Sequence, residues 1–217
     1  MIKEIHLYGD SILDNGSYVV EESSVLHQLQ KVDSNINFQL LAVDGDCARH
    51  TLEILDSVES IHDEDTGAVL SVGGNDALAM SNMMFDTVDT VAAAFGHIRE
   101  PIEQFKVGYE KVLKSLTLLY RLENIRVCTI YNKIPTQLLS HVGIGPNEML
   151  GLALFNDVIT ECANSFGIGI IDLRVVCASP DCYSSVSPIE PSEIGGMKIA
   201  KQIVNEFVYE GAYNYVR

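Results

Sequence analysis

Short, mostly apolar runs alternate along this chain with longer segments of helical periodicity. Runs that are apolar at successive positions are buried on both faces, as parallel strands are. The predicted strands are residues 2–8, 38–43, 67–72, 125–131 and 168–173. The predicted helices are residues 22–32, 51–58, 98–120, 147–166 and 192–209. Alternating strands and helices predict an α/β protein with a doubly wound, five-stranded parallel sheet.

The composition limits the organisation of this fold and its partners. A chain of 217 residues with 47% hydrophobic residues is long enough for one substantial core and short for two, so we expect a single domain, 1–217. Lys and Arg number 14 against 30 Asp and Glu, a formal charge of −16. A field of this sign repels nucleic-acid phosphates and anionic lipid, and neither is expected as a partner.

The cysteines and the first residues of the chain indicate a compartment. Five cysteines are scattered without the paired spacing of zinc ligands or of a disulfide framework, which fits a reducing environment. Met1 leads directly into the first predicted strand, without a basic segment and a long apolar segment, and no stretch of about 18 apolar residues follows. We therefore expect a cytoplasmic protein with no membrane insertion.

Polar, glycine-containing turns follow the first three predicted strands. They are Gly9-Asp10-Ser11, Asp44-Gly45-Asp46 and Gly73-Gly74-Asn75-Asp76. The carboxyl ends of parallel strands meet at one edge of the sheet, which is where ligands bind in open α/β sheets. The three turns are therefore expected to form one site.

This set of residues suits acyl transfer by a serine. A serine that attacks an acyl group needs hydrogen-bond donors directed at the oxyanion that forms. The N–H groups of Ser11 and Gly45 and the side-chain amide of Asn75 are donors of this kind. Glycine at position 45 lets the backbone approach a substrate closely.

The same blocks resemble those of the SGNH hydrolases, also called the GDSL esterase/lipase family. The matching segments are GDSIL at 9–13, VDGD at 43–46 and VGGNDAL at 72–78, in the family's order. The resemblance implies a three-layer α/β/α fold of flavodoxin type. It also implies that Ser11 is the nucleophile, that Gly45 and Asn75 complete the oxyanion hole, and that the substrate is a small ester or an acetylated molecule. No cofactor and no metal follow from it.

The last family block, D-x-x-H, corresponds here to Ser187-Pro188-Ile189-Glu190. Glu190 thus stands where the catalytic base belongs and Ser187 where its acidic partner belongs. An ordinary carboxylate, with a pKa near 4.3, is a much weaker base than imidazole. Glu190 can serve as the base if burial raises its pKa; alternatively, it only hydrogen-bonds Ser11 or caps the last helix.

Two histidines are alternative bases. His50 lies five residues after Gly45, at the mouth of the expected cleft, although a histidine there also suits pairing with Asp46 or Glu53. His141 lies in the segment that follows the fourth strand.

The substrate site is expected to include His50 and three residues of the turns, Asp10, Gly74 and Asp76. Asp10 and Asp76 are carboxylates near one cleft, but Asp10 is better explained as a helix cap, so no metal site is predicted.

These observations leave three functions open. The first is a serine ester hydrolase acting through Ser11. The second is a catalytically impaired protein of the same fold that binds an acylated ligand or a protein partner. The third is a flavodoxin-like nucleotide or flavin binder, which lacks a G-x-x-x-x-G-K motif. The oligomeric state is left open.

Overall fold

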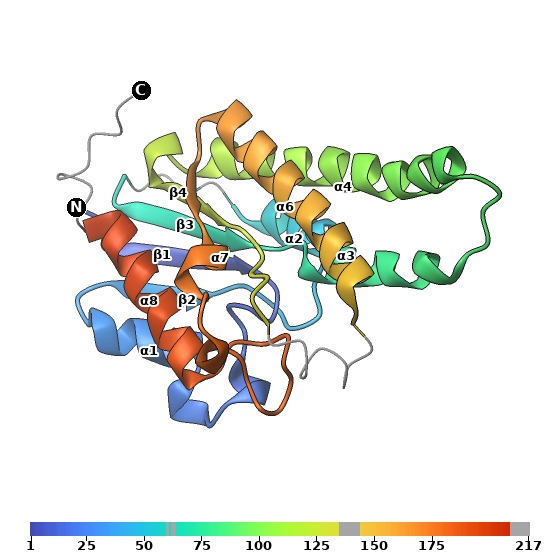
Figure 1. Ribbon diagram of the computed structural model, residues 1–217. Helices are drawn as coiled ribbons and strands as arrows, with labels where there is room; N and C mark the ends of the chain where they lie inside the picture. Colours follow the sequence, from blue (N-terminus) through green and yellow to red (C-terminus); the bar gives the residue numbers. More distant parts are fainter. Residues whose placement is uncertain (60, 62–63, 135–143, 209–217) are drawn as a thin grey trace.

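A computed structural model describes residues 1–59, 61, 64–134 and 144–208. In these residues the chain forms a five-stranded, all-parallel sheet with strand order β2-β1-β3-β4-β5 (Figure 1). The strands are β1 (Glu4–Gly9), β2 (Asn37–Leu40), β3 (Thr66–Ser71), β4 (Ile125–Cys128) and β5 (Gly169–Ile171). The predicted α/β class and parallel topology are confirmed.

Helices cover both faces of the sheet and complete three layers (Figure 1). On one face, α1 packs against α8; on the other, α4 packs against both α2 and α6. Their bounds are α1 (Val25–Val32), α2 (Ala48–Ser57), α3 (Gly74–Met80), α4 (Val91–Leu119), α6 (Pro146–Phe166), α7 (Leu173–Val176) and α8 (Glu193–Val208). Within the part of the chain described, no helix has both the length and the apolar character needed to cross a membrane.

Local sequence signals explain where the longer helices begin and end. The Thr90 hydroxyl accepts a hydrogen bond from the Ala93 N–H at 3.0 Å and caps the start of α4. Pro146 occupies the first turn of α6, where its missing N–H has no intrahelical partner to lose. Gly167, with φ of 71°, ends the same helix in the left-handed conformation that favours glycine.

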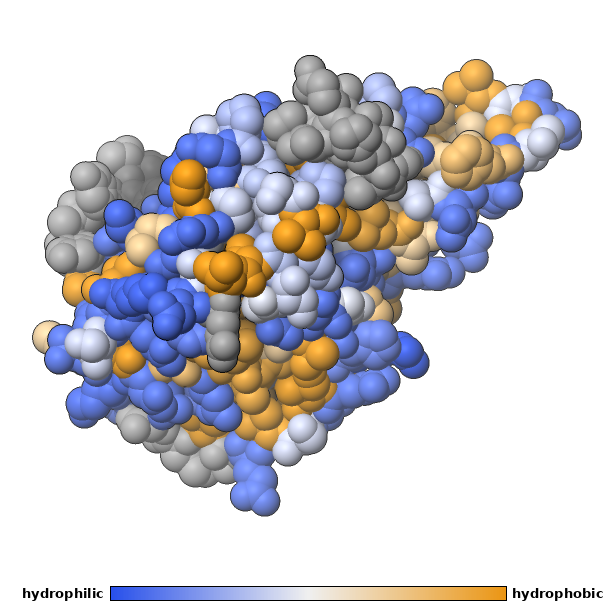
Figure 2. All heavy atoms as spheres, turned by 90° about the horizontal axis from the view of Figure 1, so that it is seen from below, coloured by the Kyte–Doolittle hydropathy of each residue, from blue (hydrophilic) through white to orange (hydrophobic). Residues whose placement is uncertain are grey.

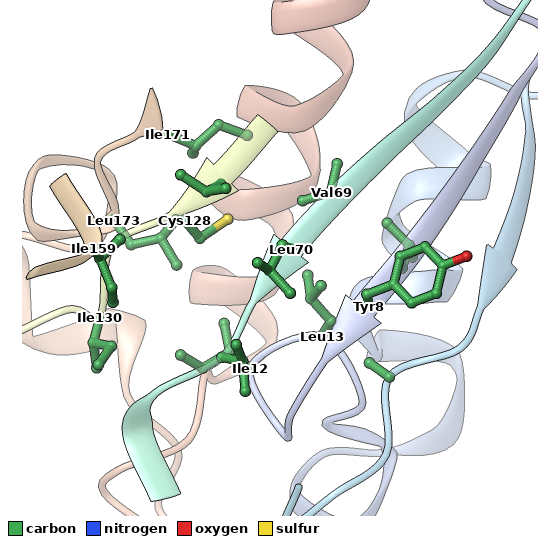
Figure 3. Close-up of a cluster of buried hydrophobic side chains, with 14 of the residues drawn as sticks. Tyr8, Ile12, Leu13, Val69, Leu70, Cys128, Ile130, Ile159, Ile171 and Leu173 are labelled. Carbon is green, nitrogen blue, oxygen red and sulfur yellow. The ribbon is translucent and has the colours of Figure 1, made fainter. Parts of the chain in front are cut away.

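The hydrophobic core lies between the sheet and the helices, and Figure 3 shows part of it. Side chains of β1 and β3, including Leu7, Tyr8 and Leu70, are completely buried there. Ile12 and Leu13, which follow Ser11 directly, point into the same cluster. The turn that carries Ser11 is therefore attached to the core on both sides.

Several elements differ from the sequence-based expectation. The α3 helix, which starts within the Gly73-Gly74-Asn75-Asp76 turn, was not predicted. Leu173 was expected to end the fifth strand, but it begins the short α7 helix. α4 starts seven residues before the predicted position 98. The predicted end of the last helix, residue 209, lies outside the described residues.

The early start of α4 has a structural reason. α3, the following 3-10 helix (Ser81–Phe85) and the first turns of α4 project from the body of the protein (Figure 1). Apolar side chains are exposed on this projection, among them Phe85, Val91 and Phe95, and orange residues mark it in Figure 2. The first turns of α4 lie beyond the sheet, so Val91 and Phe95 stay exposed although they continue the helical spacing of Ile98.

Candidate active site

Ser11 lies at the carboxyl end of the central strand β1. Gly9 ends the strand with φ of 130°, and the Asp10 N–H donates to the Ser71 carbonyl at 2.9 Å. A side chain at Gly9 would collide with that carbonyl, so glycine is required for the chain to turn here. The turn leaves the Ser11 side chain at the wall of a pocket, with 7% of the residue exposed.

Asn75 lies beside Ser11 in the same pocket, in the first turn of α3. Its side-chain amide donates a hydrogen bond to the Asp46 carbonyl at 2.8 Å. This bond joins the turns that follow β2 and β3. Gly45, next to Asp46, has a φ of 87°, is exposed and does not itself line the pocket. The Asn75 amide has two N–H groups, so its bond to Asp46 leaves one for a ligand.

Glu190 reaches the pocket from the segment before α8. It is only 5% exposed, and the hydrogen-bonding interaction of its carboxylate with the Ser11 side chain lowers its pKa. Burial acts in the opposite direction and is the larger effect, assisted by the negative charge of Asp44, so the pKa of Glu190 is raised to about 7. Its Oε2 atom is buried and has no hydrogen-bond partner among the described residues.

The segment that carries Glu190 is held by bonds to the body of the protein. Residues Tyr183 and Pro191 form an antiparallel bridge, and the Ser184 N–H donates to the Glu190 carbonyl at 2.9 Å. The Tyr131 hydroxyl donates to the Ile189 carbonyl at 2.6 Å. These contacts hold the backbone on both sides of the Glu190 side chain.

Two further buried residues complete this support. The Asn15 side-chain amide donates to the Pro191 carbonyl at 3.1 Å, and the Ser184 hydroxyl donates to the Tyr18 carbonyl at 2.8 Å. Sequence analysis missed Asn15, Tyr131 and Ser184. A signal was present for Tyr131, which follows the fourth strand at the sheet edge where ligands bind.

Asp10 also lines the pocket, but its carboxylate is engaged by the backbone. It accepts hydrogen bonds from the N–H groups of Ile12, at 3.1 Å, and of Gly74. Burial, helped by the charges of Glu190 and Asp76, raises the pKa of Asp10 to about 8 despite these bonds. Asp10 and Gly74 therefore connect the turns after β1 and β3 behind Ser11.

The structure places Asp76 and His50 on the periphery of the site, and neither lines the pocket. The Asp76 carboxylate accepts a hydrogen bond from the Ala48 N–H at 3.0 Å and so caps α2. The His50 ring lies 3.5 Å from the Asp46 carboxylate and 2.9 Å from the Arg49 guanidinium. The pairing with Asp46 that was considered from the sequence is present.

The remaining described histidines interact elsewhere. His6 contacts Tyr120 at 2.6 Å, His27 contacts Ser24 at 2.8 Å and His97 pairs with Asp86 at 2.8 Å. His141 lies outside the described residues. The half-buried Ser187 accepts a hydrogen bond from the Glu190 N–H through its backbone carbonyl, at 3.0 Å. Of the bases considered from the sequence, Glu190 is thus the one that lines the pocket with Ser11 among the described residues.

Comparison with solved structures identifies this architecture. A member of the lipolytic G-D-S-L family from Veillonella parvula matches with a TM-score of 0.67 at 16% identity, over 94% of this chain and 97% of that one. The chain has the fold of the GDSL hydrolases. The lipase/acylhydrolase of Enterococcus faecalis gives a TM-score of 0.67 at 18% identity, over 94% of this chain and 95% of that one. Phospholipase A1 of Streptomyces albidoflavus gives a TM-score of 0.65 at 15% identity, over 95% of this chain and 100% of that one.

Comparisons at the level of sequence gave no match, either to models of protein families or to curated proteins. The GDSL fold confirms the three-layer architecture that the resemblance of the GDSIL, VDGD and VGGNDAL blocks implied. The neighbouring structures are of proteins named as esterases, lipases and a phospholipase.

Proposed function

We propose that this protein is a serine ester hydrolase in which Ser11 is the nucleophile and Glu190 is the base. The observation that carries the proposal is that these two buried side chains line one pocket with Asn75, where Ser11 lowers the pKa of the Glu190 carboxylate. A fold shared with esterases and lipases supports the same reaction class. One fold can host many reactions, so the geometry of the site decides which reaction this one carries out.

In the first step, Ser11 Oγ attacks the carbonyl carbon of the ester while Glu190 takes the hydroxyl proton. The carbonyl π bond breaks, and its electron pair becomes the negative charge of a tetrahedral oxyanion. The N–H groups of Ser11 and Gly45 and the free N–H of the Asn75 amide are the proposed donors to this oxyanion. Donors fixed in advance by the fold stabilise the charge without the cost of reorienting solvent.

In the second step, the oxyanion re-forms the carbonyl and the bond to the alcohol breaks. Protonated Glu190 returns its proton to the departing alkoxide, which leaves as the alcohol. Water then attacks the carbonyl carbon of acyl-Ser11 while Glu190 again accepts a proton. The second oxyanion re-forms the carbonyl, the bond between the acyl carbon and Ser11 Oγ breaks, and Glu190 returns its proton to Ser11 Oγ as the carboxylic acid leaves. Glu190 therefore ends the cycle ionised, and Ser11 ends it as the free hydroxyl.

A carboxylate can fill this role because its environment changes its basicity. The pKa of about 7 makes Glu190 a stronger base than a solvated carboxylate while leaving a large ionised fraction at neutral pH. The bonds from Tyr131, Ser184 and Asn15 hold the 183–191 segment in place. Burial thus compensates for the absence of an imidazole at position 190.

Labelling with a fluorophosphonate probe tests the nucleophile. We expect covalent labelling of the wild-type protein above pH 7, and none of the Ser11→Ala variant, because the probe reacts with activated serine hydroxyls. Ser57→Ala is the matched control, since Ser57 is exposed at the end of α2 and its hydroxyl bonds only the Ile54 carbonyl among described residues. Equal labelling of Ser11→Ala and the wild type would exclude Ser11 as the nucleophile.

The second candidate is a binding protein that has kept the pocket and lost the reaction. It is favoured by the lack of a histidine in contact with Ser11 in the described residues. The double substitution Ser187→Asp and Glu190→His separates the two candidates. A wild-type protein without esterase activity, together with a large gain in the double variant, would identify a binding protein whose oxyanion hole is intact.

A further inference from the structure

The pocket beside Ser11 is apolar over most of its wall. It extends for about 650 Å³, including its open mouth, between α3, α6 and the segment that follows β4. Five of its aliphatic side chains define the wall away from the catalytic groups: Leu78, Ile130, Ile134, Met149 and Leu152.

The polar residues on this wall direct side-chain atoms at the protein backbone. Glu148 accepts a hydrogen bond from the Gly145 N–H at 2.8 Å, as a helix cap of α6. The Ser81 hydroxyl donates to the Leu78 carbonyl at 2.6 Å, and the Tyr131 hydroxyl donates to the Ile189 carbonyl. Hydroxyl groups of a sugar placed against this wall would lose water and find few partners among the described residues, which is costly.

We propose that this pocket binds an unbranched apolar chain of the ester, so that the substrate is an ester with a chain of several carbons and not an acetylated sugar. The inference rests on the proposed function for the position of the ester group at Ser11. To that function the inference adds the class of substrate, because an apolar wall favours esters whose aliphatic chain it can bury.

A chain-length series tests the proposal. With p-nitrophenyl esters from acetate to decanoate, we expect kcat/KM to rise about fourfold for each added methylene until the pocket is full, as the transfer free energy of a buried methylene requires. A second series of alkyl acetates, with the chain in the alcohol, shows which part of the ester occupies the pocket. A rise in either series supports the proposal.

Two alanines of α3 provide matched variants. Ala77 lines the pocket, whereas Ala79 is exposed on the same helix. Ala77→Phe fills part of the pocket, so we expect the ratio of hexanoate to acetate hydrolysis to fall on the order of tenfold. Ala79→Phe should leave the ratio unchanged. An unchanged ratio in both variants would contradict the placement of the chain.

Binding of methyl ketones, from acetone to 2-decanone, separates failure of the inference from failure of the proposed function. These ketones offer a carbonyl and a chain but no ester bond, and calorimetry measures their affinity directly. Ester hydrolysis without any dependence on chain length would overturn the inference and leave the hydrolase. Ketone affinity that rises with chain length, without hydrolysis of any ester, would overturn the hydrolase and leave the apolar pocket. Absence of any ester hydrolysis, together with a ketone affinity that does not change with chain length, would overturn both.

Discussion

The Glu190→Gln variant is expected to lower kcat/KM for ester hydrolysis by about 10²- to 10⁴-fold, the usual contribution of general acid–base catalysis. Glutamine has the shape of glutamate but cannot accept the Ser11 proton. The Glu190 backbone bonds to Ser184 and Ser187 do not involve the side chain, so the segment should keep its position. The loss is measured by steady-state kinetics on the best ester of the chain-length series.

The pH profile gives this prediction a signature that a structural role would not produce. The base must be ionised to act, so wild-type kcat/KM should be lost as pH falls through about 7, the raised pKa of Glu190. Below that pH, the rate should fall tenfold per pH unit; above it, the rate should level off. In Glu190→Gln, this inflection should disappear from the residual activity.

Glu193→Gln is the matched control, because Glu193 is exposed at the start of α8, three residues after Glu190. We expect it to retain wild-type kinetics and the inflection near pH 7. If Glu190→Gln kept both the wild-type rate and the inflection, another group would have to activate Ser11. His141 would then be the first residue to replace.

The sheet and its three polar turns could be predicted from the sequence, because both depend on the local pattern of residues. Continuous apolar runs identify buried parallel strands, and glycines at strand ends identify sharp turns. Parallel topology then requires the turns to share an edge, and Ser11 and Asn75 do lie in one pocket. The boundaries were less accurate: β4 ends at Cys128, three residues before the predicted end.

The support around Glu190 was not predictable in the same way, because it depends on contacts between residues far apart in sequence. Asn15 bonds the Pro191 carbonyl across 176 positions, and Tyr131 bonds the Ile189 carbonyl across 58. The raised pKa of Glu190 also depends on burial, which the sequence of the segment does not reveal. The sequence therefore left the role of Glu190 open between a base and a structural partner.

The Gly9→Ala variant is expected to lose its folded state. An alanine Cβ at this position would lie 1.7 Å from the Ser71 carbonyl oxygen, which β3 and the Asp10 N–H hold in place. The φ of 130° adds strain that only glycine avoids. Relief of the clash would require separation of the two central strands, at a cost of more than about 4 kcal/mol, a large part of the stability of an ordinary domain. Chemical denaturation followed by circular dichroism measures the loss.

Two other glycines separate the clash from the backbone strain. Gly45 has a positive φ of 87° and open space around it, so Gly45→Ala should destabilise the fold by about 1–2 kcal/mol through strain alone. Gly16 has neither a positive φ nor a neighbour within 4 Å of an added Cβ, and Gly16→Ala should change stability by less than about 1 kcal/mol. Gly16→Ala should therefore be the most stable of the three variants, Gly45→Ala the next, and Gly9→Ala the least stable. If Gly9→Ala unfolded at the same denaturant concentration as Gly16→Ala, β1 and β3 would not approach each other as closely at Gly9 as described. The turn that directs Ser11 into the pocket would then need another explanation.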